Sequence, residues 1–419
     1  MDKFVIRGGR TLSGCVKISG AKNAALPIMA SALLTRGISI LENVPNLQDI
    51  LSMIKLLENM NVVVDFNDGV MTIDSTNMIY KKAPYEIVRR MRASIYVLAP
   101  TLVMFKHAQV SFPGGCAIGA RPIDLHLMAL DKLGAKVKVE HGYIVTEVDK
   151  LIGNTIHFEK ISVGATANSL MMAVLAEGKT TIINASMEPE ITNLIEFLNA
   201  MGADIKGRGT NTLIVKGVKK LKATKIKIIP DRIEAGTFLL AAAITKSKIS
   251  ILDCNVEHLR ALLEKMKEVG CRFVLEKDSI TIYPAKKSNT TMKIITRAYP
   301  GFPTDLQAQF IAYMSVMKNT LLMEDVVFPD RFMHVPELCR LGADITIESN
   351  IVMVKGVKSL SAAKVMATDL RASAALVLAG LVADGETEIL RIYHIDRGYD
   401  SFETKLQNLG ANIKRVKDS

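Results

Sequence analysis

The chain has 419 residues, of which 49% are hydrophobic and 23% are charged. This composition excludes a disordered chain and a fibrous protein, and the length favours two or three globular domains. The net charge of +11 favours anionic partners, which could be nucleic acids, membrane surfaces or small phosphorylated molecules.

The sequence contains no targeting or disulfide pattern. No apolar run reaches the roughly 18 residues of a membrane span, and the first ten residues lack the apolar core of a signal peptide. The five cysteines are an odd number without any C-x-x-C pair, which argues against a disulfide framework and a zinc site. We therefore expect no membrane association and a location in the reducing cytoplasm.

One short pattern recurs six times along the chain. An apolar helix end is followed by Leu-Gly-Ala or a close variant, and then by a strand of alternating polarity, as in KLGAKVKV at 132–139. The central Gly or Asn returns at intervals of 68 to 73 residues, which indicates internal duplication. The six positions are Asn61, Gly134, Gly202, Gly270, Gly342 and Gly410.

Each copy predicts the same order of elements. Gly, and less often Asn, tolerates the left-handed conformation that ends a helix. The alternating strand, a turn such as His141-Gly142 and a second strand predict a hairpin. Six units of strand, helix, strand, helix and hairpin, in two groups of three, would give two similar α/β domains with helices buried inside sheets. The strands that lie between the two helices are expected at 38–44, 108–112, 180–186, 248–254, 319–326 and 387–393.

A lysine-rich stretch, residues 216–228, falls between the third and fourth units. It is the best candidate for a crossing between the two domains. The alternative is a solvated basic strand within one domain.

Polar residues interrupt the apolar pattern at two places in each unit. The first place is the start of the apolar helix, which offers unpaired N–H groups and the positive end of the helix dipole to an anion. The second is the loop after the following strand. A single Arg or Lys there could also be a solvated surface group, and Asp305 and Asp369 could be simple N-caps. The helix-start positions include Lys22, Asn23, Arg92, Ser162 to Gly164, Asp231, Arg232, Asp305, Asp369 and Arg371, and the loop positions include Cys116, Arg121, Asp330, Arg331, Asp396 and Arg397.

Cys116 differs from the other cysteines in its surroundings. It lies in the glycine-rich loop PGGCAIGAR, five residues before Arg121, and a nearby guanidinium favours the thiolate. We therefore expect a reactive thiol at Cys116. The remaining cysteines lie within helix or strand patterns and are interpreted as small core residues. They are Cys15, Cys254, Cys271 and Cys339.

Several motifs are absent from the sequence. It contains neither the P-loop G-x-x-x-x-G-K-[ST] nor H-E-x-x-H, and its seven histidines are scattered without ligand spacing. No dinucleotide fingerprint follows Gly8-Gly9. We therefore expect no metal site and no cofactor.

The helix-start and loop motifs resemble those of one family along the whole chain. The most specific are SGAKNAALPIM from Ser19, PGGCAIGARPIDLH from Pro113, FPTDLQAQ from Phe302 and RIYHIDRGY from Arg391. They resemble the UDP-N-acetylglucosamine 1-carboxyvinyltransferases, also called UDP-GlcNAc enolpyruvyl transferases or MurA enzymes, of the EPSP synthase family. The resemblance implies an inside-out α/β barrel of six repeated βαβαββ units. It also implies one domain at 21–229 and a second made of 1–20 and 230–419.

The resemblance also implies a reaction. These transferases move the enolpyruvyl group of phosphoenolpyruvate to the 3′-hydroxyl of UDP-N-acetylglucosamine and release phosphate, by addition and elimination through a tetrahedral intermediate. The reaction is the first committed step of peptidoglycan synthesis, and so serves cell-wall biogenesis, cell shape and cell division. A cysteine in the loop also implies inactivation by the epoxide fosfomycin.

By the same resemblance, individual residues are expected to have roles. Cys116 would donate the proton to the vinyl carbon and can form a covalent phospholactoyl adduct, Asp305 would accept the proton of the sugar hydroxyl, and Lys22 and Arg397 would complete the catalytic set. Phosphoenolpyruvate would be held by Lys22, Asn23, Arg121, Arg371 and Arg397. The nucleotide sugar would be lined by Arg92, Arg121, Pro122, Ile123, Asp124, Leu125, Lys160, Ser162, Val163, Gly164, Asp305 and Val327, with Arg331 and Asp369 supporting the cleft.

Two other functions compete with this one. A basic scaffold that binds nucleic acid would need aromatic residues among its lysines for stacking, but aromatics make up only 5% and Trp is absent. We therefore expect small-molecule substrates and no nucleic acid. Within the enzymes, a transferase that acts on shikimate 3-phosphate is the alternative, and Cys116 together with Lys22-Asn23 argues against it.

Overall fold

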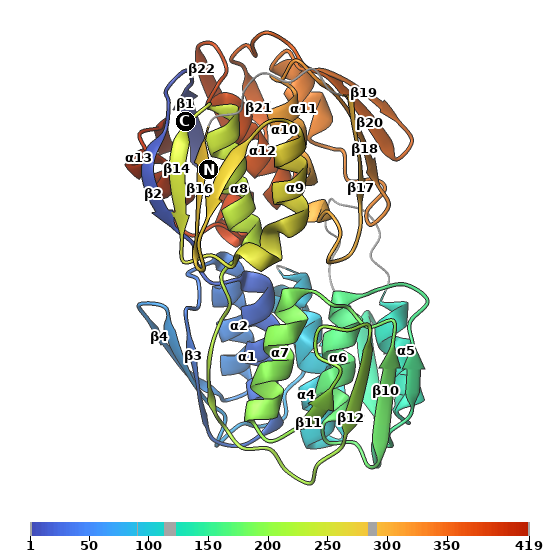
Figure 1. Cartoon of the computed structure of the whole chain (residues 1–419). Coiled ribbons are helices and arrows are strands. Elements are labelled where there is room, and N and C mark those ends of the chain that lie inside the picture. Colours follow the sequence, from blue (N-terminus) through green and yellow to red (C-terminus); the bar gives the residue numbers. More distant parts are fainter. Residues whose placement is uncertain (1, 90, 113–122, 284–290, 418–419) are drawn as a thin grey trace. The chain divides into compact units, whose positions relative to one another are not determined.

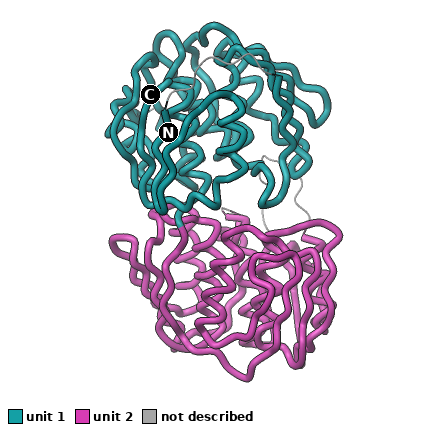
Figure 2. Tube along the Cα trace, in the orientation of Figure 1, with its two compact units in different colours: residues 1–19, 117–119, 230–419 teal, residues 20–116, 120–229 magenta. Residues whose placement is uncertain are grey.

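The computed structural model describes residues 2–417 apart from 90, 113–122 and 284–290. These residues form two compact units (Figure 2). The N-terminal unit, named for its position in the sequence, contains the described residues from 20 to 229. The C-terminal unit contains the described residues of 2–19 and 230–417. No described helix is long and apolar enough to cross a membrane.

The repeat predicted from the sequence is present in both units. In the described residues, a unit of the repeat begins with a short strand. This first strand pairs in parallel with the strand that follows the apolar helix. The strand after the apolar helix then pairs antiparallel with the closing hairpin. One unit has an N-terminal bridge in place of its first strand, between Ala83 and Val110.

The N-terminal unit contains three sheets with this arrangement. Their strand orders are β13(Lys225–Lys227)-β3(Ile38–Glu42)-β5(Val70–Asp74)-β4(Val63–Asn67), β6(His107–Ser111)-β8(Tyr143–Glu147)-β7(Lys136–Glu140) and β11(Asp204–Lys206)-β12(Thr212–Lys216)-β10(Lys179–Ile183)-β9(Thr155–His157).

The C-terminal unit repeats the arrangement in three sheets of its own. Their strand orders are β15(Arg272–Leu275)-β16(Ser279–Tyr283)-β14(Lys248–Leu252)-β2(Ser13–Lys17), β17(Thr291–Thr296)-β18(Thr320–Asp325)-β20(Ile351–Lys355)-β19(Asp344–Glu348) and β21(Lys364–Met366)-β22(Glu386–Leu390)-β1(Asp2–Arg7)-β23(Asn412–Lys417). The N-terminal strands β1 and β2 therefore complete sheets whose other strands come from after residue 230.

Helices that are apolar on all sides fill the interior of each unit, as expected for helices without a solvated face. In the C-terminal unit these are α8(Arg232–Ile244), α10(Gln307–Met314) and α12(Leu370–Gly380), which pack on one another inside the sheets (Figure 1). In the N-terminal unit they are α1(Lys22–Ser31), α4(Leu98–Phe105) and α6(Val163–Ala173). This inside-out α/β architecture confirms the predicted fold class.

The second helix of each repeat covers the sheet and keeps one polar face. These outer helices are α2(Gln48–Asn59), α5(Asp124–Lys132), α7(Pro189–Ala200), α9(Arg260–Glu268), α11(Val335–Arg340) and α13(Phe402–Asn408). Shorter helical segments are α3(Tyr85–Val88), η1(Ala32–Leu34), η2(Arg92–Val97), η3(Val256–Leu259), η4(Thr304–Leu306) and η5(Ile392–Arg397).

The local chemistry that predicted the repeat is confirmed. All six helix-stop residues have a positive φ, from 60° at Asn61 to 106° at Gly202. In the hairpin turn between β7 and β8, His141 and Gly142 have φ values of 49° and 77°. Two successive positive φ angles match the twist of a tight hairpin, which explains the glycine there.

The lysine-rich stretch 216–228 does not cross between units, so its preferred interpretation was wrong. Residues 225–227 form β13, which pairs in parallel with β3 inside the N-terminal unit. The strand supplies the first strand of the first repeat, and its lysines are exposed. The alternative of a solvated basic strand within one domain is therefore confirmed.

The prediction for the structural cysteines is half right. Cys254 and Cys271 are buried, as expected of small core residues, and burial raises the pKa of each thiol to about 11. Cys15 and Cys339 are exposed. Cys15 lies on β2, at the edge of its sheet, and Cys339 lies on the outward side of α11.

Candidate active site

The polar residues predicted at helix starts lie at helix starts. In the N-terminal unit, Lys22 is the first residue of α1, Arg92 is the first residue of η2, and Ser162 is the N-cap of α6. In the C-terminal unit, Asp305 lies in η4 just before α10, and Asp369 is the N-cap of α12.

Lys22 is buried and paired. Its Nζ lies 2.9 Å from Oδ2 of Asp49, which is in the first turn of α2 and is also buried. Asn23, the next residue of α1, is exposed. Burying an ammonium is unfavourable unless its charge is compensated, and the Asp49 carboxylate supplies that compensation. Sequence reasoning missed Asp49, because nothing in the pattern separates it from an ordinary acidic residue at a helix start.

The start of α6 gathers a second set of predicted residues. The Ser162 hydroxyl accepts a hydrogen bond of 3.2 Å from the backbone N–H of Ala165, while Val163 and Gly164 are half-exposed. Lys160 is exposed two residues before the cap. The first turn of a helix has N–H groups without partners inside the helix, and together with a nearby ammonium these favour an anion.

The start of α5 contributes further predicted residues. Asp124 is exposed, Leu125 is half-buried and Ile123 is buried. His126, which sequence reasoning did not single out, is buried on the same helix and lies against Gly164 of α6. Burial and the neighbouring Arg92 guanidinium lower the pKa of His126 to about 4, although Asp124 opposes this shift. The predicted residues Cys116, Arg121 and Pro122 lie outside the described residues.

In the C-terminal unit, Asp305 is held between two arginines. Its Oδ1 lies 2.6 Å from Nη1 of Arg331, and its Oδ2 lies 3.0 Å from Nη2 of Arg371. Burial would raise the pKa of Asp305, but Arg371 and Arg331 outweigh burial and hold that pKa well below its usual range. Its side chain caps no helix, so the simple N-cap alternative does not apply to Asp305.

Both arginines are themselves buried and positioned. Arg331 also donates to the Thr304 hydroxyl at 3.2 Å. The Arg371 guanidinium lies 5.5 Å from the ring centre of Tyr399, whose hydroxyl is hydrogen-bonded to Thr237 at 2.9 Å. Such side chains hold a fixed orientation, which suits recognition of a planar carboxylate or a phosphate.

Asp325 organises the loop that carries Val327 and Arg331. Its Oδ1 accepts hydrogen bonds from the backbone N–H of Val327 at 3.0 Å and of Phe328 at 2.8 Å. Its Oδ2 accepts one of 2.7 Å from the hydroxyl of Thr304. Asp325 is fully buried and was not predicted, because its position at the end of β18 looks like an ordinary strand end.

Asp369 is a simple N-cap, which was one of its two possible roles. Its Oδ1 accepts the backbone N–H groups of Arg371 at 2.8 Å and Ala372 at 3.1 Å, which makes it the N-cap of α12. By this cap it also fixes the backbone of Arg371.

The loop after β22 carries Asp396 and Arg397 at the end of η5. The Asp396 carboxylate accepts two hydrogen bonds from Arg415, of 3.0 and 2.6 Å, so its role is to join η5 to β23. Arg397 is half-buried and lowers the pKa of His394, in addition to the larger effect of burial.

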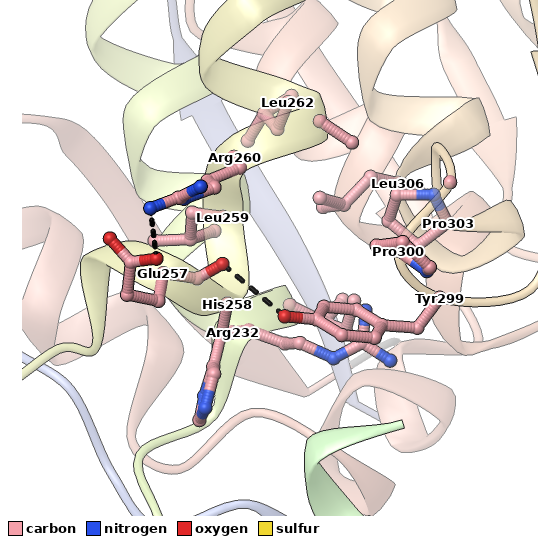
Figure 3. A pocket seen from close by; sticks show the side chains of 13 residues that line it. Arg232, Glu257, His258, Leu259, Arg260, Leu262, Tyr299, Pro300, Pro303 and Leu306 are labelled. Carbon is pink, nitrogen blue, oxygen red and sulfur yellow. Dashed lines mark hydrogen bonds and ion pairs between the residues drawn. The ribbon is translucent and has the colours of Figure 1, made fainter. Parts of the chain in front are cut away.

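A separate pocket lies at the start of α8. It is lined by Arg232, His258, Arg260, Tyr299 and Leu306 among others, and an ion pair between Glu257 and Arg260 lies at its side (Figure 3). It contains none of the residues predicted to bind substrate. No group of three His, Cys, Asp or Glu side chains that could hold a metal is found in the described part of the chain.

Comparison with known proteins identifies the family. A family model described as EPSP synthase (3-phosphoshikimate 1-carboxyvinyltransferase) matches residues 6–406. A UDP-N-acetylglucosamine 1-carboxyvinyltransferase of Geobacter metallireducens is 51% identical over 418 residues and covers 100% of both chains. One from Campylobacter hominis is also 51% identical, with the same coverage.

Solved structures show the same fold. The enolpyruvyl transferase NikO from Streptomyces tendae superposes with a TM-score of 0.91 at 23% identity, covering 100% of this chain and 99% of its own. An EPSP synthase from Acinetobacter baumannii gives a TM-score of 0.77 at 18% identity, covering 100% of both chains. Together with the full-length relatives, these matches show that the chain belongs to the EPSP synthase family, among its UDP-N-acetylglucosamine 1-carboxyvinyltransferases.

Proposed function

We propose that this protein transfers the enolpyruvyl group of phosphoenolpyruvate to the 3′-hydroxyl of UDP-N-acetylglucosamine and releases phosphate. The observation that carries this proposal is identity of about half over the full length to relatives named for that transfer. The buried cations Lys22 and Arg371 at helix starts, and the buried Arg331 in a loop, support it, because both substrates are anions.

The proposed reaction has two steps. In the addition, the vinyl CH₂ carbon of phosphoenolpyruvate takes a proton, and the sugar oxygen forms a bond to the neighbouring carbon after losing its own proton. In the elimination, the methyl group gives up a proton, the double bond re-forms and the bond to phosphate breaks. The chemistry needs a proton donor, a base and cations around the phosphate and carboxylate.

The roles that we assign are the following. Cys116 protonates the vinyl carbon, and Asp305 accepts the hydroxyl proton. Phosphoenolpyruvate is held by Lys22, Asn23, Arg121, Arg371 and Arg397. The nucleotide sugar is held by Arg92, the 121–125 segment, Lys160 and the α6 start, together with Asp305 and Val327.

The state of Asp305 adds one requirement. A carboxylate paired with two guanidinium groups is a weak base, so it cannot readily accept a proton while Arg331 and Arg371 hold it at 2.6 and 3.0 Å. We propose that anionic phosphoenolpyruvate competes for Arg371 as it binds. That competition would loosen the hold on Asp305 and raise its pKa toward the value of a useful base.

The test of the function is phosphate release from phosphoenolpyruvate by the purified protein. Release that depends on UDP-N-acetylglucosamine and is lost in Cys116→Ser supports the proposal. Phosphate release that depends instead on shikimate 3-phosphate would favour the second function, transfer of the enolpyruvyl group to shikimate 3-phosphate. The description of the matching family model names that activity. If neither UDP-N-acetylglucosamine nor shikimate 3-phosphate supported phosphate release, both functions would be overturned.

We also propose that the enzyme acts in the cytoplasm on small molecules. The described cysteines all carry free thiols, which fits a reducing compartment. Activity of the protein in a cytosolic extract, with none in the other fractions of the source cell, tests this location.

A further inference from the structure

A buried histidine and a buried asparagine form a pair beside the start of α6. Asn168 lies on α6 and is 2% exposed, and His126 lies on α5 and is 7% exposed. Nδ2 of Asn168 lies 2.8 Å from Nδ1 of His126 and 3.2 Å from the backbone carbonyl oxygen of Ile95. All three residues belong to the N-terminal unit.

These two distances decide which ring nitrogen carries the proton. A backbone carbonyl only accepts hydrogen bonds, so the nitrogen of the Asn168 amide, and not its oxygen, must face Ile95. The same nitrogen faces Nδ1 of His126 with its second hydrogen. Nδ1 must therefore accept, and the proton of the neutral imidazole lies on Nε2.

This arrangement is unfavourable for the oxygen of the Asn168 amide. The Oδ1 atom of Asn168 is buried, and no hydrogen-bond partner for it is found in the described part of the chain. Leaving a buried carbonyl oxygen without a partner is unfavourable. Stability alone does not explain an asparagine at position 168. We infer that the direction of its two side-chain N–H bonds serves another role.

Nε2 of His126 faces the predicted substrate-binding helix start. A Cβ added to Gly164 would lie 3.0 Å from Nε2 and 3.1 Å from Cε1 of His126. Gly164 follows the Ser162 cap at the half-exposed start of α6. The hydrogen bond between His126 and Asn168 uses the other ring nitrogen, Nδ1. The absence of a side chain at 164 thus leaves room for the ring at the place where helix N–H groups are free to bind a ligand.

We propose that Asn168 is a positioning residue for nucleotide-sugar binding, which fixes His126 as the tautomer that presents Nε2–H at the start of α6. There the ring donates a hydrogen bond to an acceptor oxygen of the nucleotide sugar. The proposal rests on the proposed function for the identity of the ligand, but not for the tautomer. Burial and Arg92 keep His126 neutral, while Asp124 acts in the opposite direction.

The first experiment reads the tautomer in the free protein. ¹⁵N NMR of histidine-labelled wild type, with His126→Gln to assign the resonance among the seven histidines, should show Nε2 protonated and Nδ1 unprotonated at neutral pH. A proton on Nδ1 would overturn the proposal. This readout needs no substrate, so it stands even if the proposed function fails.

The second experiment changes the positioning residue. In Asn168→Asp the carboxylate can only accept, so it should draw the proton to Nδ1 and raise the Kd for UDP-N-acetylglucosamine by roughly tenfold or more. The matched control is Asn199→Asp on α7, since Asn199 also bridges backbone atoms, those of Ile205, at 3.0 and 3.1 Å. It should leave both the His126 tautomer and the Kd unchanged.

The outcomes distinguish a failure of the proposed role of Asn168 from a failure of the proposed function. An Asn168→Asp protein with the wild-type tautomer or the wild-type Kd contradicts the role of Asn168. Should that variant not fold, Gly164→Ala tests the same contact by crowding the ring, with a higher Kd expected and the Nε2–H tautomer retained; an unchanged Kd would count against the contact. Wild-type protein that fails to bind UDP-N-acetylglucosamine would refute the proposed function and leave the tautomer assignment in place.

Discussion

The ammonium of Lys22 lies 2.9 Å from the carboxylate of Asp49, and the two side chains are only 11% and 6% exposed. The pair joins the first turn of an inner helix, α1, to the first turn of an outer helix, α2. Because phosphoenolpyruvate is proposed to bind Lys22, Asp49 keeps a cation in place before the anionic substrate arrives. An unpaired ammonium at this depth would be an uncompensated buried charge, which is strongly unfavourable.

The first prediction concerns this pair. Asp49→Asn should lower the free energy of unfolding by about 3 to 5 kcal/mol, because it leaves a buried charge without its partner. Urea denaturation measures the loss. The control is Glu268→Gln, which breaks the exposed pair with Lys265 and should cost no more than about 1 kcal/mol. Equal effects of the two substitutions would contradict the buried role of Asp49.

The second prediction concerns Asp305. Asp305→Asn should lower kcat by about a hundredfold or more, since it removes the proposed base. In the wild type, the acid limb of kcat should lie at higher pH than that of kcat/KM, because kcat reports the substrate complex, in which Arg371 is drawn toward the substrate. Steady-state rates across the acid range measure both limbs. Coincident limbs would show that substrate binding leaves the Asp305 pKa where the two arginines set it.

The third prediction is an acid-sensitive stability. Burial is the largest cause that lowers the pKa of His126 and of His334 to about 4, against about 6.5 for the free side chain. Between these values the unfolded chain binds protons at these two histidines that the folded chain does not, so their contribution to the free energy of unfolding falls as pH falls from about 6.5 to 4. Each histidine contributes up to about 3 kcal/mol to this loss.

Denaturation at several pH values checks this slope. His126→Gln should flatten it, whereas the same change at the exposed His157 should not. A slope that is identical in both variants and the wild type would show that His126 does not remain neutral on folding.

The repeat made much of the fold predictable. Helix stops, hairpin turns and strands are local features, so their residues carry the information themselves, as Gly134 and His141-Gly142 illustrate. The helix-start positions were predictable for the same reason. Lys22, Ser162, Asp305 and Asp369 all follow a strand or turn and precede an apolar run.

Features that depend on a partner from another repeat were not predictable. Asp49 matters because Lys22 reaches it from a neighbouring helix, and Asn168 matters because His126 and Ile95 come from other segments. The strand at 225–227 joins a sheet whose other strands lie at 38–74, so its own lysines gave no sign of the pairing. Exposure of Cys15 depends on its being at the edge of a sheet, which only the assembled fold determines.

The fourth prediction concerns the thiol of Cys116. Cations that bind phosphoenolpyruvate also favour the thiolate, yet a proton donor must keep its proton. The anionic substrate resolves this conflict if it neutralises the positive field as it binds. The apparent pKa of Cys116, read from the pH dependence of its alkylation rate, should therefore rise when substrate is added.

The same thiol should react with fosfomycin. The thiolate attacks an epoxide carbon, the carbon–oxygen bond opens, and the released oxygen takes a proton, so one equivalent should inactivate the enzyme with a matching gain in mass. Cys116→Ser should show neither the mass gain nor the substrate-dependent alkylation, while Cys15→Ser, which removes an exposed thiol outside the predicted site, should keep both. A substrate-induced fall in the apparent pKa would mean that the cations, and not the substrate charge, dominate the field at the sulfur. Cys116 would then be held as a thiolate during binding, and the proton for the vinyl carbon would have to come from another group.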